Sequence, residues 1–174
     1  ECYLVRSQGR TLLVDTGLGN GTSNPAVVAN IGGGIDGVLL TELEAAGFQA
    51  TDIDTVFLTH LHPDHVGWNV TRNGGEESAT FPNARYVAHE ADWAAFDTPR
   101  DSQIFGYDWW AATVAPLCRM GVLDLLNEAT ELTRELTLTP TPGHTPGSLT
   151  MTANSVGQRA FILAAGVHAP APGP

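Results

Sequence analysis

A dense cluster of potential metal ligands stands at Thr59–His65, where the sequence reads THLHPDH. It combines His60, His62 and His65 with one carboxylate, Asp64. Imidazole nitrogens and carboxylate oxygens are common ligands of divalent metals. Side chains two apart in extended backbone point the same way, so His60 and His62 can aim at one ion. Asp64 and His65 are adjacent and face differently, so they can serve a second ion beside the first.

A third imidazole for the first ion is available from His144, in the stretch TPTPGHTPGS at Thr139–Ser148. Prolines restrict the backbone and glycines permit tight turns, so this loop can hold one side chain in a fixed place. A catalytic zinc ion takes three protein ligands and leaves the fourth position to water. We therefore predict one zinc ion at His60, His62 and His144. Mn²⁺ and Fe²⁺ are alternatives to Zn²⁺, because these ligands bind all three metals.

The chemistry that such a site performs is hydrolysis. A bound Zn²⁺ lowers the pKa of its water to about 7 and so provides hydroxide at neutral pH. The sequence has no GxSxG motif and no Cys/His pairing that would indicate a nucleophilic side chain. The residues are therefore compatible with hydrolysis by a zinc-bound hydroxide.

The histidine cluster follows a predicted strand, Asp52–His60, which carries a short apolar run at its centre. Runs of this kind are typical of strands covered on both faces, and α/β sheets bind ligands at the carboxyl ends of their strands. No repeat or linker divides the chain, so we expect a single α/β domain over residues 1–174. The other expected elements are strands at Tyr3–Arg6, Thr11–Asp15, Ala84–Ala88, Glu135–Thr141, Ser148–Ala153 and Arg159–Ala164, and helices at Asp36–Gly47, His89–Phe96 and Tyr107–Met120, with a break at Pro116.

The composition narrows the class of partner. A net charge of −11 argues against nucleic acid and anionic membranes, which need a basic face. No apolar run approaches the roughly 18–20 residues that cross a bilayer. Two cysteines, Cys2 and Cys118, are too few for a disulfide scaffold. We expect a small-molecule substrate and a cytoplasmic location.

Three motifs together resemble the metallo-β-lactamase fold hydrolases: HLHPDH, LVDTG at Leu13–Gly17, and TPGHTPGS at Thr141–Ser148. The resemblance implies a four-layer αββα sandwich with a two-metal site at its edge. It also implies ligand roles that agree with those above. The first ion would be held by His60, His62 and His144, and the second by Asp64 and His65, with Asp64 also catalytic and Asp15 supporting the ligands from below.

The DTG triplet alone is also the motif of aspartic proteases. Those enzymes need a second aspartate in a matching context, which this sequence lacks. The metallo-hydrolase resemblance is therefore the one we follow.

Within that family, the stretch PNARYVAHEADW at Pro82–Trp93, together with His168 and Pro170, looks most like lactonases and organophosphate hydrolases. The implied substrates are lactones, esters or phosphotriesters. Trp68, just after the metal loop, is the candidate for substrate contact.

The end of the chain departs from the family pattern. Ala165 stands where the family has an aspartate that bridges the two metals, and a further downstream histidine ligand is absent. His168 could substitute as a ligand or could simply face solvent. We expect the last strands and helix of the sandwich to be missing, and the chain to be partial at both ends and poorly active by itself.

Two further hypotheses follow from these departures. One is a non-catalytic or impaired metal-binding domain of the same fold. The other is a partial copy of an active enzyme. An uncovered sheet face would also allow a homodimer.

Overall fold

The first of two main sheets contains the strands that precede the histidine cluster. In the computed structural model, which describes residues 1–20, 37–97, 103–104 and 107–163, this sheet has five strands. Their order is β1 (Tyr3–Ser7), β2 (Arg10–Val14), β3 (Thr55–Phe57), β6 (Arg85–His89) and β9 (Leu123–Leu126). β1 and β2 form an antiparallel hairpin, and β2, β3, β6 and β9 run parallel. The parallel strands therefore end at one edge of the sheet.

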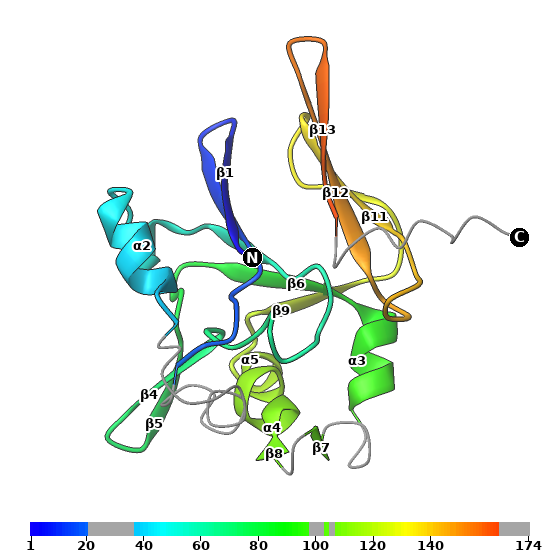
Figure 1. Cartoon of the computed structure of the whole chain (residues 1–174). Helices are drawn as coiled ribbons and strands as arrows, with labels where there is room; N and C mark the ends of the chain where they lie inside the picture. Colours follow the sequence, from blue (N-terminus) through cyan, green and yellow to red (C-terminus); the bar gives the residue numbers. More distant parts are fainter. Residues whose placement is uncertain (21–36, 98–102, 105–106, 164–174) are drawn as a thin grey trace, which may run out of the picture.

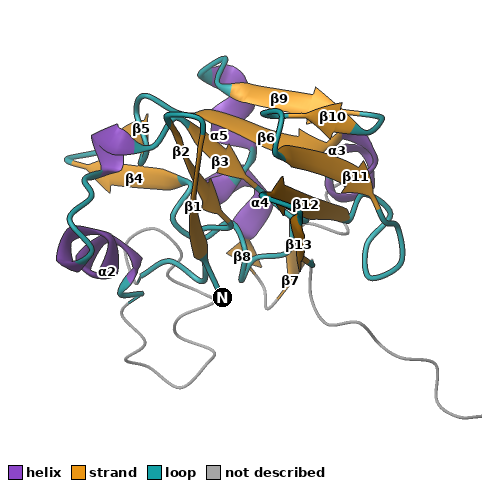
Figure 2. Ribbon diagram, turned by 90° about the horizontal axis from the view of Figure 1, so that it is seen from above, coloured by secondary structure: helices purple, strands orange, loops and turns teal. Residues whose placement is uncertain are grey.

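The second sheet is antiparallel throughout and follows later in the chain. It contains β10 (Thr130–Glu131), β11 (Leu136–Pro140), β12 (Leu149–Ser155) and β13 (Gln158–Ile162), in chain order. Leu138 pairs with Met151, which pairs with Ile162, so these apolar side chains share one face. Figures 1 and 2 show this sheet packed beside the first one.

Each face of the first sheet covers a separate hydrophobic core. Alternation along β2 sends Leu13 to one face and Leu12 and Val14 to the other. The core between the two sheets contains Leu12, Val14, Phe57, Val87, Leu136, Leu138, Leu149 and Met151, all buried. This arrangement explains why β2 and β3 are apolar on both faces.

The opposite face of the first sheet is covered by helices. They are α2 (Leu39–Ala45), α3 (Glu90–Phe96), α4 (Trp109–Thr113) and α5 (Ala115–Arg119), and each contributes side chains to that core or against it. A helical layer and two sheets are thus three of the four expected layers, which confirms the predicted fold class. On the outer face of the second sheet, Phe161 is 58% exposed among the described residues.

The smaller elements are a 3₁₀ turn, η1 (Ala50–Asp52), and two hairpins. The hairpins are β4 (Val70–Asn73) with β5 (Glu76–Ala79), and β7 (Gln103–Ile104) with β8 (Tyr107–Asp108). Among the described helices, none has the length and apolar character required to cross a membrane.

Several predicted boundaries were wrong. The strand expected at Asp52–His60 is only β3, because η1 occupies its start and a loop begins at Leu58. The helix expected at Tyr107–Met120 is divided into α4 and α5, as Pro116 near the start of α5 predicts. The β4–β5 hairpin and β9 were not anticipated. Gly74 and Gly75 both have positive φ in the hairpin turn, so the NGG triplet was the available signal.

Candidate metal centre

The carboxyl ends of β2 and β3 bring two of the predicted motifs together. β2 leads directly into Asp15, and β3 leads into the loop that carries the histidine cluster. The loop between β11 and β12 brings His144 from the second sheet to the same place. The backbone N–H of Leu149 donates to the carbonyl of Thr59 at 2.8 Å, which ties the two sheets together beside the site.

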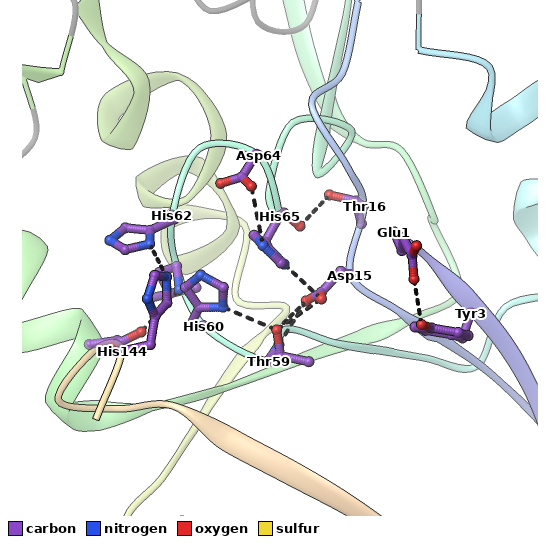
Figure 3. Close-up of polar contacts among 12 residues, drawn as sticks. Glu1, Tyr3, Asp15, Thr16, Thr59, His60, His62, Asp64, His65 and His144 are labelled. Carbon is purple, nitrogen blue, oxygen red and sulfur yellow. Dashed lines mark hydrogen bonds and ion pairs between the residues drawn. The ribbon is translucent and has the colours of Figure 1, made fainter. Parts of the chain in front are cut away.

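His60, His62 and His144 converge on one point (Figure 3). One ring nitrogen from each lies within 4.8 Å of the other two, and His62 Nδ1 is 3.0 Å from His144 Nε2. Tetrahedral zinc, with Zn–N bonds of about 2.0–2.1 Å, separates its nitrogen ligands by roughly 3.3 Å. The three imidazoles therefore stand close to the spacing that a single metal ion requires.

His60 shows in its hydrogen bonds which nitrogen is free to bind metal. The Thr59 hydroxyl donates its only proton to the Asp15 carboxylate, at 2.8 Å from Oδ2. Its oxygen therefore accepts from His60 Nδ1, at 3.2 Å. That assignment leaves the lone pair on His60 Nε2, a buried atom with no hydrogen-bond partner among the described residues. A divalent cation fits this orphaned nitrogen.

The electrostatics of the cluster also suit metal binding, since neutral imidazole is the ligand form. Burial, followed by the neighbouring His65, lowers the pKa of His60 to about 2. Burial and His144 likewise lower the pKa of His62. Both rings are therefore neutral at physiological pH without any metal present.

Asp15 lies beneath the histidines and binds none of the three directly. It is buried, and it accepts from the Thr59 N–H and hydroxyl and from His65 Nδ1, the last at 2.8 Å. Its φ is +59°, a left-handed conformation that aspartate tolerates better than most residues. Asp15 thus contacts Thr59 and His65, which flank the first-ion ligands of this loop, and its supporting role stays a prediction.

Asp64 and His65 form a neighbouring pair. Asp64 Oδ2 lies 3.3 Å from His65 Nε2, and the His65 and His60 ring centroids are 4.0 Å apart. Burial acts to lower the pKa of His65, but hydrogen bonds with Asp15 and Asp64 raise it to about 9. The hydrogen bond with His65 lowers the pKa of Asp64 to about 2. The pair is thus ionised, and a second cation there would replace the proton on Nε2.

Trp68 borders a cavity of about 620 Å³ that is also lined by Asp64 but not by the three convergent histidines. Cys2, Gly17 and Leu39 are among its other lining residues. Trp68 is 8% exposed, and its indole N–H has no partner in the described part of the chain. The predicted substrate contact therefore faces space that a small molecule could occupy. The predicted residue His168, like Ala165, lies outside the described residues.

Sequence reasoning missed Asp92, on α3. Its carboxylate accepts hydrogen bonds from Leu61, Thr145 and Gly147, which flank the predicted ligands. An aspartate in the first turn of a helix normally indicates only helix stability. Nothing local in the sequence distinguishes Asp92 from such a residue.

Comparison with known proteins agrees with this geometry. A family model described as "Metallo-beta-lactamase superfamily" matches residues 1–156. No curated protein matches the chain significantly.

Among solved structures, a probable metal-dependent hydrolase from Staphylococcus aureus is 25% identical, with a TM-score of 0.75, and the match covers 91% of this chain and 55% of that one. A dizinc quorum-quenching lactonase in complex with a product is also 25% identical, with a TM-score of 0.67, over 91% of this chain and 53% of that one. A hydrolase of the beta-lactamase superfamily, AbOPH, is similar in fold at 24% identity and a TM-score of 0.70, over 93% of this chain and 54% of that one. The chain thus spans about half the length of these structures. On the family match and the shared fold, the chain belongs to the metallo-beta-lactamase superfamily.

Proposed function

We propose that this chain carries the metal centre of a hydrolase that acts on a small-molecule lactone, ester or phosphotriester. The observation that carries the proposal is the convergence of three imidazoles, one of which has a buried Nε2 with no partner among the described residues. Such an arrangement costs free energy unless a cation occupies it, because a buried polar atom without a partner is destabilising.

The roles of the individual side chains follow from their contacts. His60, His62 and His144 would hold a first divalent cation, and Asp64 with His65 would contribute to a second. When bound, such a cation lowers the pKa of a coordinated water and polarises the substrate oxygen. Zn²⁺ suits three nitrogen ligands, and Mn²⁺ or Fe²⁺ are the alternatives.

Asp64 is the proposed catalytic residue. Its side chain is 56% exposed, lines the cavity and is ionised at neutral pH. A carboxylate with so low a pKa is a weak base, so its proposed role is to orient an attacking water by accepting a hydrogen bond from it. Trp68 lines the same cavity, so its side chain is the proposed substrate contact.

The choice of substrate class rests on the cavity and on the relatives. Burial raises the pKa of the Cys2 thiol to about 11, so this part of the wall is uncharged. Glu1, Glu42 and Asp64 also line the cavity, so an uncharged, partly apolar molecule suits it better than an anion. The dizinc lactonase among the similar structures makes a lactone the first substrate to test.

The second candidate function is a metal-binding domain with impaired catalysis. Ala165 stands in the sequence where the bridging carboxylate is expected, and Asp64 and His65 are the second-ion ligands that we propose among the described residues. Without an anionic bridge, two cations close together repel each other with less compensation. A homodimer and a cytoplasmic location also stay predictions.

Metal content distinguishes the candidates. The protein would be dialysed exhaustively and analysed for zinc, manganese and iron, beside the variant His144→Ala. We expect at least one tightly held ion per chain in the wild type and a large loss in the variant, because one of three ligands is removed.

Hydrolysis of an N-acyl homoserine lactone, an aryl ester and an aryl phosphotriester would then be measured with each metal restored. Two ions with metal-dependent turnover would support the hydrolase. One ion without turnover would support the impaired domain, and no ion in the wild type would contradict both.

A further inference from the structure

Asp92 is a fully buried carboxylate that contacts both segments carrying the predicted first-ion ligands. It is 0% exposed, and none of the ion pairs among the described residues involves it. Burying a carboxylate is costly unless hydrogen bonds compensate for the lost water. The positions of its donors are therefore informative.

One donor comes from the histidine cluster. The backbone N–H of Leu61, which lies between His60 and His62, donates to Asp92 Oδ2 at 3.0 Å. The position of this peptide unit sets the direction in which both neighbouring imidazoles leave the backbone.

The other donors come from the loop that carries the third imidazole. The Thr145 hydroxyl donates to Oδ2 at 2.9 Å, and the Gly147 N–H donates to Oδ1 at 2.6 Å. Thr145 directly follows His144 and is itself buried. A Cβ built on Gly147 would lie 2.5 Å from the Asp92 backbone nitrogen, so this close approach requires glycine.

We propose that Asp92 is a positioning residue for the metal centre, which holds His60 and His62 in register with His144. The proposal rests on the metal site of the proposed function. The two segments come from different sheets, and their ligand residues are more than 80 positions apart in the chain. A single carboxylate on a third element, α3, makes hydrogen bonds to both. Because the loops are already ordered, metal binding does not include the free-energy cost of ordering them.

The sharpest variant is Asp92→Asn, which keeps the size and removes the charge. In either orientation of the amide, its NH₂ group faces one of the two backbone N–H donors, Leu61 or Gly147. One buried N–H then loses its acceptor. The loop that carries that donor should shift, and the three nitrogens should no longer match one ion.

The matched control is Glu90→Gln, on the same first turn of α3. Glu90 is exposed, and the substitution removes the same charge from the same helix. A general effect of net charge is common to both variants, whereas the charge of Asp92 also acts directly on His62, so the spectrum of the Co²⁺ form is the readout that separates position from charge. Only Asp92→Asn alters the contacts with the two ligand segments.

The experiment titrates the metal-free 174-residue chain with Zn²⁺ against a chromophoric chelator, and records the visible d–d spectrum of the Co²⁺ form. For Asp92→Asn we expect the Zn²⁺ Kd to rise by about tenfold or more, in the range seen when outer partners of metal ligands are removed. The Co²⁺ spectrum should change in intensity, since it reports ligand geometry. Glu90→Gln should match the wild type in both measurements.

Thr145→Val is a milder variant that removes one hydrogen bond of the three, and circular dichroism checks that each variant is folded. If Asp92→Asn does not fold, Thr145→Val carries the test, with an expected Kd increase of about fivefold.

A folded Asp92→Asn variant with a Kd within twofold of wild type and an unchanged Co²⁺ spectrum would overturn the positioning role, even if its thermal stability fell. If the wild type itself bound neither ion, the metal site would fail and this role with it. If the wild type bound metal and hydrolysed substrate while Asp92→Asn bound metal equally well, only the role of Asp92 would fail.

Discussion

Among single residues, His65 and His60 have pKa values that are shifted in opposite directions. His65 Nδ1 lies 2.8 Å from the Asp15 carboxylate and Nε2 lies 3.3 Å from Asp64, so the charged imidazolium is favoured. His60 is buried among other imidazoles, so its charged form is disfavoured. The same short segment therefore contains one cationic ring and one neutral ring.

The raised pKa of His65 predicts a loss of stability at alkaline pH in the metal-free protein. Its pKa is about 9 in the folded state and about 6.5 when unfolded, so between these values the folded state binds more protons. The stabilisation is complete below about pH 6.5 and is lost as pH rises through 9. We expect the free energy of unfolding to fall by roughly 3 kcal/mol over this range.

Urea unfolding of the metal-free protein between pH 6 and pH 10 would measure this decline. The variant His65→Gln, which cannot titrate, should show a flatter profile over that window. An equally steep decline in the variant would assign the effect to other groups.

At the scale of elements, the loop after β3 is locked against the turn after β2. The Thr16 N–H donates to the His65 carbonyl at 2.7 Å, and the Gly67 N–H donates to the Gly17 carbonyl at 2.7 Å. A Cβ built on Gly67 would overlap the backbone of Leu18. Glycine is required at position 67 because two backbone segments touch there, and this contact places Asp15 under the histidines.

This contact predicts that Gly67→Ala is strongly destabilising. The neighbouring atoms are backbone and cannot rotate away, so we expect a loss of roughly 2–4 kcal/mol in the free energy of unfolding. Denaturant unfolding of the metal-free protein would measure it.

Gly143→Ala is the control, since it adjoins the predicted ligand His144 but a Cβ there meets nothing within 4 Å. Its effect should stay within about 0.5 kcal/mol. Equal losses in the two variants would show that the close approach is not the cause.

At the scale of the whole molecule, the candidate metal site connects the two sheets. His60 and His62 follow β3 of the first sheet, whereas His144 lies between β11 and β12 of the second. The sheets also meet through the apolar core around Phe57 and Leu138. A metal ion at the three imidazoles would add a link at the edge of that core.

We therefore expect Zn²⁺ to stabilise the whole fold and not only the loops. A ligand at 100 times its Kd adds about 2.7 kcal/mol. In a chain of this size that corresponds to an increase in Tm of roughly 5–10 °C. Calorimetry with and without Zn²⁺ would measure the increase.

His144→Ala should lose most of that increase while keeping a cooperative transition, because its own loop tolerates the smaller side chain. A full Zn²⁺ effect in this variant would place the stabilising ion elsewhere.

Residue types and their spacing were enough to identify the candidate ligands and the kind of loop that carries them. The two-residue spacing of His60 and His62 and the prolines around His144 affect only the neighbouring backbone. Their local geometry can therefore be predicted from the sequence. The alternation of side chains along β2 and the start of a new helix near Pro116 could be predicted for the same reason. The boundaries of β3 and the existence of β9 were not, because short apolar runs fit more than one element.

The hydrogen bonds that hold these ligands could be seen only in the folded structure. The free nitrogen of His60 depends on a hydrogen-bond chain through Thr59 to Asp15, 44 residues away. Asp92 acts across 31 residues to Leu61 and 53 to Thr145. Hydrogen bonds between segments so distant in the chain depend on how whole elements pack. Residue type and spacing alone cannot reveal which buried carboxylate will meet which donor.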